Sequence, residues 1–168
     1  MSDYDLSSLR IMIVDSHVPM RRILWGILRE WNINNIAEAA NGQEALDKMK
    51  GASADVLITE YKMHPIDGLE LTKTIRSGES GADPYLPIIL ISSYTEMKTI
   101  LDARDAGANE FLAKPISAKL VYDRLRMIIE NPRAFVRTEN FLGPDRRRHT
   151  QHITGEDRRV TQNEAADP

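Results

Sequence analysis

The sequence predicts a doubly wound α/β fold, in which five parallel strands form one sheet that is covered by helices on both faces. Short apolar segments alternate with amphipathic segments of helical period along the first 130 residues. Near-continuous apolar strands are typical of parallel sheets, because both faces of such a sheet are buried. The five expected strands lie at 11–14, near 35–39, and at 56–58, 88–91 and 110–113.

Helices are expected after each of these strands, at about 18–31, 42–50, 69–77, 95–106 and 117–130. In the first of them, four apolar residues recur at helical spacing and are therefore expected to face the sheet. They are Met20, Leu24, Ile27 and Trp31.

The composition bounds the class of protein. The chain has 168 residues, of which 42% are hydrophobic, and it contains no cysteine, so no disulfide or thiolate metal site can form. This is enough for one domain core, expected over residues 1–130, with an extension over residues 131–168. No apolar run reaches the roughly 18–20 residues of a membrane span, and residues 1–5 lack the features of a signal peptide. We therefore expect a cytoplasmic protein that does not insert into membranes.

Polar residues follow four of the expected strands: Asp15 and Ser16, Glu60, Ser92, and Lys114. Because the carboxyl ends of parallel strands meet at one edge of a sheet, we expect these side chains to form one cluster. The sequence offers no histidine base for Ser92 and no substrate pocket for the two carboxylates. We therefore expect no catalytic residues and no enzyme.

In order and spacing, these motifs resemble the receiver domain of two-component response regulators, most closely its single-domain CheY-like form, over roughly residues 8–130. The resemblance implies that Asp15 stands at a metal-binding position, Glu60 at the phosphoacceptor position and Ser92 at the conserved hydroxyl. It also implies that Phe111 is the aromatic switch residue and that Lys114 is the conserved lysine before a usually cis proline.

The sequence departs from the family pattern where phosphorylation takes place. The family's phosphoacceptor is an aspartate, whereas this chain has Glu60, and Ser16 replaces the second metal-binding acid. Lengthening the acceptor by one methylene displaces its carboxylate by about 1.5 Å, which is unfavourable for in-line attack on a phosphoryl group. Magnesium needs near-ideal octahedral geometry, so we expect at most a weak site at Asp15 and Glu60. Glu60 either pairs with Lys114 and holds the domain in one state or is an inert residue that keeps the fold.

The extension is rich in arginine. It contains seven arginines, no lysine and six acidic residues, a net charge of +1, whereas residues 1–130 carry −4. Two units of the form Gly-x-Asp-Arg-Arg, at 143–147 and 155–159, lie 12 residues apart. Because the segment has too few apolar residues for a second core, we expect much of it to be flexible until it binds a partner.

Arginine favours ligands that accept two hydrogen bonds at once, such as phosphate or the O6/N7 edge of guanine. The neighbouring aspartates can accept from guanine N1 and N2, whereas the low net charge disfavours duplex nucleic acid. A receiver with such an extension resembles the Cle class of CheY-like effectors, which implies cyclic di-GMP as a regulatory ligand. The residues expected to bind it are Arg137, Asp145, Arg146, Arg147, Arg148, Asp157, Arg158 and Arg159.

The Cle class acts on the bacterial flagellar motor, so the resemblance implies a protein target such as the flagellar switch and recruitment to the flagellated pole. The target would bind the face formed by the fourth helix, fifth strand and fifth helix, where Lys98, Thr99, Ile100 and Phe111 lie. Three alternatives remain open. They are a ligand-independent pseudo-receiver, a receiver that is still phosphorylated, and a nucleic-acid-binding protein whose affinity for long polymers depends strongly on salt.

Overall fold

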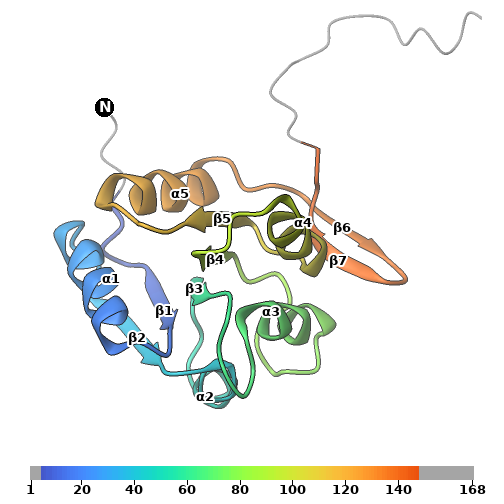
Figure 1. Cartoon of the computed structure of the whole chain (residues 1–168), viewed down its shortest axis with the longest axis horizontal. Helices are drawn as coiled ribbons and strands as arrows, with labels where there is room; N and C mark the ends of the chain where they lie inside the picture. Colours follow the sequence, from blue (N-terminus) through green and yellow to red (C-terminus); the bar gives the residue numbers. More distant parts are fainter. Residues whose placement is uncertain (1–4, 148–168) are drawn as a thin grey trace, which may run out of the picture.

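A computed structural model describes residues 5–147 and confirms the predicted doubly wound fold. The parallel sheet has the strand order β2-β1-β3-β4-β5 (Figure 1). Its strands are β1 (Arg10–Val14), β2 (Asn35–Ala39), β3 (Val56–Glu60), β4 (Ile88–Ser92) and β5 (Glu110–Ala113). The helices are α1 (Val18–Glu30), α2 (Gly42–Met49), α3 (Gly68–Ser77), α4 (Met97–Ala106) and α5 (Ala118–Glu130).

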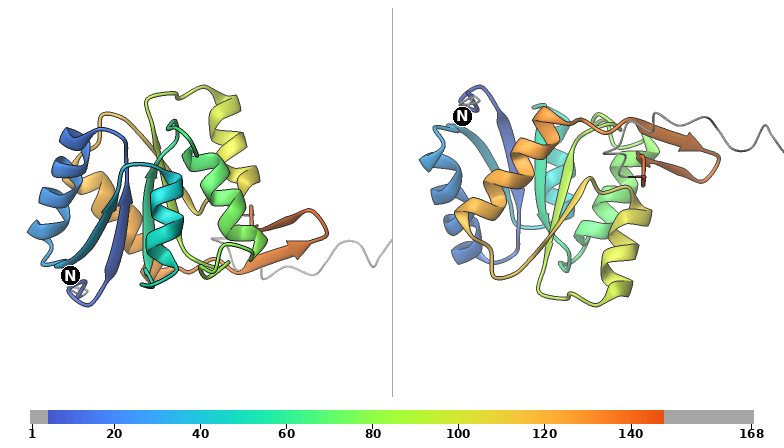
Figure 2. Two further views of the ribbon diagram at one scale, coloured as in Figure 1. Left: turned by 90° about the horizontal axis from the view of Figure 1, so that it is seen from below. Right: turned by 90° about the horizontal axis from the view of Figure 1, so that it is seen from above.

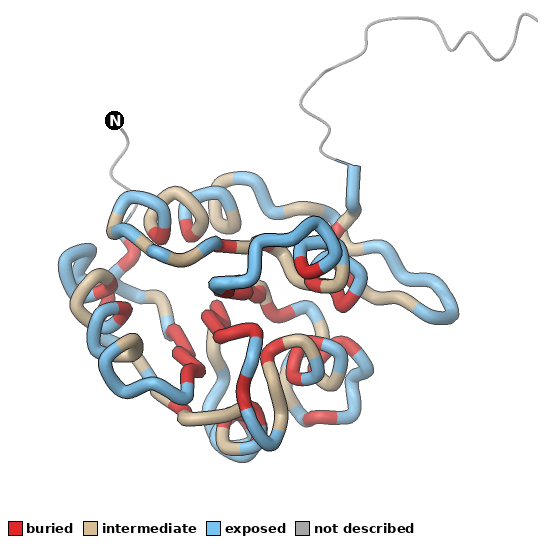
Figure 3. Tube along the Cα trace, viewed as in Figure 1, coloured by how far each residue is buried: buried red, intermediate tan, exposed pale blue. Residues whose placement is uncertain are grey.

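Helices cover both faces of the sheet, with α1 and α5 on one side and α2, α3 and α4 on the other (Figures 1 and 2). Every residue of β3 and β4 is buried, as expected for central strands of a parallel sheet. Figure 3 shows this burial along the central strands and on the inner sides of the helices. Within residues 5–147, no helix is long and apolar enough to cross a membrane.

The predicted inner face of α1 was partly wrong. Leu24 is buried as expected, but its partner in the core is Leu28, which the predicted stripe did not include. Trp31 lies one residue beyond the end of α1 and is 36% exposed. Its ring stacks on Tyr122 of α5, with the ring centroids 4.0 Å apart. Because the helix ends at Glu30, the helical period no longer applies to Trp31.

The extension contains a β-hairpin that the sequence analysis did not anticipate. Strands β6 (Phe135–Thr138) and β7 (Phe141–Pro144) pair in antiparallel fashion, and the hairpin lies against the ends of α3 and α4 (Figures 1 and 2). A Cβ atom on Gly107, which has φ +102°, would lie 2.6 Å from the carbonyl oxygen of Leu142. A Cβ atom on Gly143 would lie 2.9 Å from the Cα of Gly107. The hairpin therefore packs backbone to backbone on the receiver and needs no core of its own.

A buried arginine fixes the docking surface of the hairpin. Arg76, near the end of α3, donates hydrogen bonds of 2.7–3.0 Å to the carbonyl oxygens of Pro84, Leu86 and Gly107 and to the Oδ1 of Asn109. Burial lowers the pKa of Arg76 to about 10, so its guanidinium is still charged at neutral pH.

The guanidinium of Arg76 also lies 4.9 Å from the ring centroid of Phe135 in β6. Tyr85 packs edge-on against the same ring, with the centroids 5.2 Å apart. Arg76 thus links α3, the segment before β4, the turn before β5 and the hairpin.

We predict that Arg76→Ala lowers the free energy of unfolding by about 2–4 kcal/mol, because it leaves several buried carbonyl groups without a donor. Urea denaturation followed by circular dichroism measures this change. Arg22→Ala, at an exposed position of α1, is the matched control and should change the unfolding free energy by no more than about 0.5 kcal/mol. Equal effects of the two substitutions would contradict the role of Arg76.

Candidate functional site

The fold brings four of the predicted polar residues together at the carboxyl edge of the sheet. Asp15 directly follows β1, Glu60 and Ser92 are the last residues of β3 and β4, and Lys114 directly follows β5. Asp15 is 2%, Glu60 6% and Ser92 0% exposed. The Lys114 ammonium pairs with Oε2 of Glu60, and its Nζ lies 3.9 Å from Oδ2 of Asp15. The carboxylates therefore share one ammonium group.

The structure has Glu60 paired with Lys114, which is one of the two interpretations that the sequence left open. The contact is a close ion pair rather than an aligned hydrogen bond. Burial raises the pKa of Glu60, the neighbouring Asp15 acts in the same direction, and the Lys114 ammonium opposes the rise. Lys114 thus provides the main compensation for burying the carboxylate.

Local backbone contacts hold Glu60 in place. The N–H of Gly68, the first residue of α3, donates to the carbonyl oxygen of Tyr61 at 3.0 Å. A Cβ atom on Gly68 would lie 2.1 Å from the carbonyl oxygen of Glu60, so only glycine allows this approach. Asp67 caps the helix by accepting from the N–H of Glu70 at 2.8 Å. The Asp67-Gly68 motif therefore fixes the start of α3 against the end of β3.

The donor set fits magnesium poorly. Oδ1 of Asp15 accepts from the backbone N–H of His17 at 2.8 Å and lies 3.3 Å from Nδ1 of His17. The Ser16 side chain, which replaces a carboxylate of the family, is exposed. In the part of the chain that the structure describes, no group of three or more His, Cys, Asp or Glu side chains could hold a metal ion.

Ser92 has a structural partner in this arrangement, because its Oγ accepts from the N–H of Tyr94 at 2.9 Å. The peptide bond between Lys114 and Pro115 is cis. Phe111 is half-buried and packs with Leu90 and Ala103 between the sheet and α4. These residues lie where the receiver resemblance implies.

A five-stranded parallel sheet with a carboxylate, a hydroxyl and a lysine at its carboxyl edge defines the class of signal receiver domains. Residues 11–126 match the response regulator receiver domain, and the chain belongs to that family. It is 33% identical to chemotaxis protein CheY-3 of Vibrio cholerae over 123 residues, covering 73% of this chain and 93% of the relative. It is 30% identical to chemotaxis protein CheY of Pseudomonas aeruginosa over 122 residues, covering 73% and 97%.

Solved structures agree with this assignment. A two-component response regulator from Clostridium difficile superimposes with a TM-score of 0.66 at 27% identity, covering 74% of this chain and 98% of that one. The CheX–CheY–BeF3–Mg complex of Borrelia burgdorferi gives a TM-score of 0.65 at 26% identity, covering 72% and 89%. The family match therefore assigns this chain to the receiver domains of two-component signalling.

The expected output face needs one correction. Thr99 is buried, so it is not available to a partner. Lys98, in contrast, is exposed and pairs with Asp102 at 2.7 Å. The exposed apolar residues on and just before α4 are Tyr94, Met97, Ile100 and Leu101. Thr99 was expected on this surface only because it belongs to the fourth helix, whereas in the structure it is on the side of α4 that is buried.

Among the described residues of the extension, Arg137 and Arg146 line different cavities. Arg137 lines a groove beside α3, and its Nη2 lies 3.5 Å from the Tyr85 hydroxyl. Arg146 lines a smaller depression beside β5, and its guanidinium lies 3.3 Å from Asp105 and 4.5 Å from the ring centroid of Phe141. Asp145 accepts from the N–H of Arg147 at 3.0 Å. Arg148, Asp157, Arg158 and Arg159 lie outside the described residues.

Sequence reasoning missed a second anchor of the extension. The Glu110 carboxylate, buried at the start of β5, lies 2.9 Å from Arg133 and 3.3 Å from Arg124. Arg133 also donates to the carbonyl oxygen of Asn109. A glutamate inside an otherwise apolar strand segment was the available signal, since a buried carboxylate requires a cation.

We predict that Glu60→Gln changes how stability depends on pH. A carboxyl with a raised pKa binds more protons in the folded chain, so its contribution is full below the unfolded value of about 4.5 and is lost as pH rises through the folded pKa. Wild type should therefore lose unfolding free energy relative to Glu60→Gln as pH rises from about 4.5 toward neutrality. Urea denaturation between about pH 4 and 8 tests this, with Glu70→Gln on the surface of α3 as control. A difference that does not vary with pH would contradict it.

We also predict that wild type incorporates no phosphate from acetyl phosphate and Mg²⁺, because Glu60 is one methylene too long and is paired with Lys114. The double substitution Ser16→Asp, Glu60→Asp restores the family's carboxylates and should gain incorporation. Mass spectrometry of the intact chain measures it, and Ser16→Asp alone is the matched control. Incorporation by wild type that Glu60→Gln abolishes would show that the protein is still a phosphorylated receiver.

Proposed function

We propose that this protein is a CheY-like cytoplasmic signalling protein that responds to cyclic di-GMP instead of phosphorylation and then binds a protein target, such as the flagellar motor switch. The observation that carries the proposal is the ion pair of Glu60 with Lys114 at the phosphorylation position. In a phosphorylated receiver, this lysine would be available to an incoming phosphoryl group. Here it already has a buried carboxylate partner, so the input must come from elsewhere.

The arginine-rich extension is the candidate input. Arg146 and Arg147 are exposed, and their partners Asp105 and Asp145 belong to surface ion pairs of 3.3 and 3.4 Å. Such pairs contribute little to stability, about 0–1 kcal/mol, and can therefore be exchanged for a ligand. Phosphate and guanine acceptors suit the planar guanidinium group. The proposed site also includes Arg148, Asp157, Arg158 and Arg159.

The extension is also joined to the surface that would carry the output. Arg133 reaches Glu110 of β5, and Arg146 reaches Asp105 of α4. The apolar side chains of Met97, Ile100 and Leu101 are exposed on α4, as is expected for a protein-binding face. The relative from Borrelia burgdorferi forms a complex with the protein CheX, and the two chemotaxis relatives share this chain's family. These similarities support a protein target and a role in motility.

A second candidate is favoured by the same ion pair. If Glu60 and Lys114 hold the receiver in one state without any ligand, a partner could recognise that fixed state directly. This pseudo-receiver would need no nucleotide. It differs from the primary proposal in one measurable respect, the binding of cyclic di-GMP.

We predict that the full chain binds cyclic di-GMP in isothermal titration calorimetry, and that Arg146→Ala, Arg147→Ala weakens binding at least tenfold. A charge-assisted hydrogen bond contributes about 1.5–3 kcal/mol, which corresponds to about tenfold or more in affinity. Lys119→Ala, an exposed cation of α5, is the control and should leave affinity unchanged. If titration of the wild-type chain with cyclic di-GMP gives no binding heat, the nucleotide proposal is contradicted and the pseudo-receiver is favoured.

A further inference from the structure

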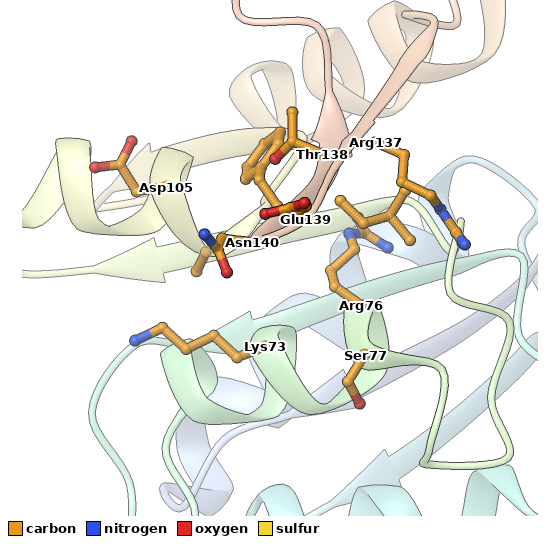
Figure 4. A pocket seen from close by; sticks show the side chains of 11 residues that line it. Lys73, Arg76, Ser77, Asp105, Arg137, Thr138, Glu139 and Asn140 are labelled. Carbon is orange, nitrogen blue, oxygen red and sulfur yellow. The ribbon is translucent and has the colours of Figure 1, made fainter.

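A groove lies between α3, the last turn of α4 and the hairpin of the extension (Figure 4). Its volume is about 440 Å³, within the range of small-molecule sites. Lys73 and Ser77 of α3 form one wall, and the residues of the hairpin turn, Glu139 and Asn140, form the other. Figure 4 shows Arg137 toward one end of the groove and Asp105 toward the other. The groove is at the opposite end of the strands from Glu60 and Lys114.

Charged groups with no protein partner face this groove. Among residues 5–147, the Lys73 ammonium and the Glu139 carboxylate form no ion pair or side-chain hydrogen bond, either with each other or with another residue. The Arg137 guanidinium has no carboxylate partner in this part of the chain, and its one side-chain hydrogen bond there is to the Tyr85 hydroxyl. In contrast, Arg146 and Arg147 both pair with aspartates, and the partner of Arg146, Asp105, lines the groove. The groove therefore offers two cations and one anion to a ligand.

The walls of the groove are held in position by buried contacts. Arg76 lies behind it, with four hydrogen bonds to the receiver and its guanidinium against Phe135 of the hairpin. The close contact between Gly107 and Gly143 fixes the hairpin against the end of α4. A site that is already formed does not lose ordering entropy when it binds a ligand, so its few polar groups can contribute fully to affinity.

We propose that this groove binds a guanine nucleotide. Lys73 holds the phosphate, while the Glu139 carboxylate accepts from the N1 and N2 donors of the base and the Asn140 amide contacts the same edge. Arg137 lies toward the opposite end of the groove from the Lys73 ammonium (Figure 4). A simple phosphate would leave Glu139 unused, and an extended polyanion would be repelled by Glu139 and Asp105. An adenine base would present no matching pair of donors to the carboxylate.

This inference rests on the proposed function and deepens it, because the groove would be the receiver's own half of the cyclic di-GMP site. Arg146, whose partner Asp105 lines the groove, and Arg147 would then hold the other half. A ligand shared in this way contacts α3, the end of α4 and the hairpin at once. Its binding is thereby linked to the position of α4, which carries the exposed apolar face.

The test is a set of titrations of the full chain with cyclic di-GMP, GMP, AMP and pyrophosphate, followed by calorimetry and by NMR shifts of backbone amides. We expect Lys73→Ala to weaken the binding of cyclic di-GMP and of GMP at least tenfold. Glu139→Gln should weaken the binding of both guanine ligands by a similar factor without weakening the binding of pyrophosphate, which separates base recognition from phosphate binding. Lys119→Ala is the charge-matched control and should bind all ligands as wild type does. Equal urea midpoints for the variants would show that the substitutions leave the fold intact.

The outcomes separate this inference from the proposed function. Suppose that Lys73→Ala and Glu139→Gln bind cyclic di-GMP like wild type, whereas Arg146→Ala, Arg147→Ala does not. The groove is then not a nucleotide site, and the proposed function stands. If GMP binds in a Lys73-dependent manner but cyclic di-GMP does not bind, the groove is a guanine nucleotide site and the proposed function is wrong. If no nucleotide binds, both are overturned.

Discussion

The parallel direction of the five strands is the constraint on which the remaining structure depends. In a parallel sheet all carboxyl ends meet at one edge and all amino ends at the other, so the two edges acquire different chemistry. Asp15, Glu60, Ser92 and Lys114 occupy the carboxyl edge. Arg76, Asn109 and the docked hairpin occupy the opposite one, at the beginnings of β4 and β5. The receiver therefore carries the residues at the family's phosphorylation position and the attachment surface of the hairpin at separate ends.

At the carboxyl ends of the strands, a glutamate, Glu60, replaces the family's phosphoacceptor aspartate, and this replacement alters the chemistry of the site. A buried carboxylate is costly unless a cation compensates it, and Lys114 supplies that cation for Glu60. The same lysine lies 3.9 Å from Asp15, so it balances two negative side chains. Removing one member of such a buried pair typically costs about 3–5 kcal/mol. Lys114 thus contributes to the stability of the domain by compensating these carboxylates.

At the opposite edge, two buried arginine networks join the extension to the receiver. The burial of the Arg76 guanidinium is compensated by hydrogen bonds to carbonyl oxygens and to Asn109 rather than by an ion pair with a carboxylate. Glu110 is instead shared by Arg124 of α5 and Arg133 of the extension. Both networks end next to α4 and β5, so displacement of the hairpin would be felt at these elements. Under the proposed function, this arrangement would allow ligand binding at the extension to alter the face formed by α4, β5 and α5.

The sequence by itself determined the doubly wound fold, the alternation of strands and helices, and the polar cluster at the strand ends. These features depend on hydrophobic period and on residues that lie directly at element boundaries, such as Asp15, Glu60 and Lys114, and both are local properties. The sequence left open whether Glu60 pairs with Lys114. These two residues are 54 positions apart and meet only when β3 and β5 take their places in the sheet.

Only the tertiary structure decided the form of the extension. Its apolar content is too low for an independent core, yet Phe135 packs on Arg76 and Gly143 packs on Gly107 of the receiver. The hairpin is stable on a surface that other segments provide, and no local pattern records such a surface. Three other features could not be predicted from local patterns for the same reason, because each depends on contacts between elements that are distant in sequence. They are the burial of Thr99, the position of Trp31 and the groove beside Lys73.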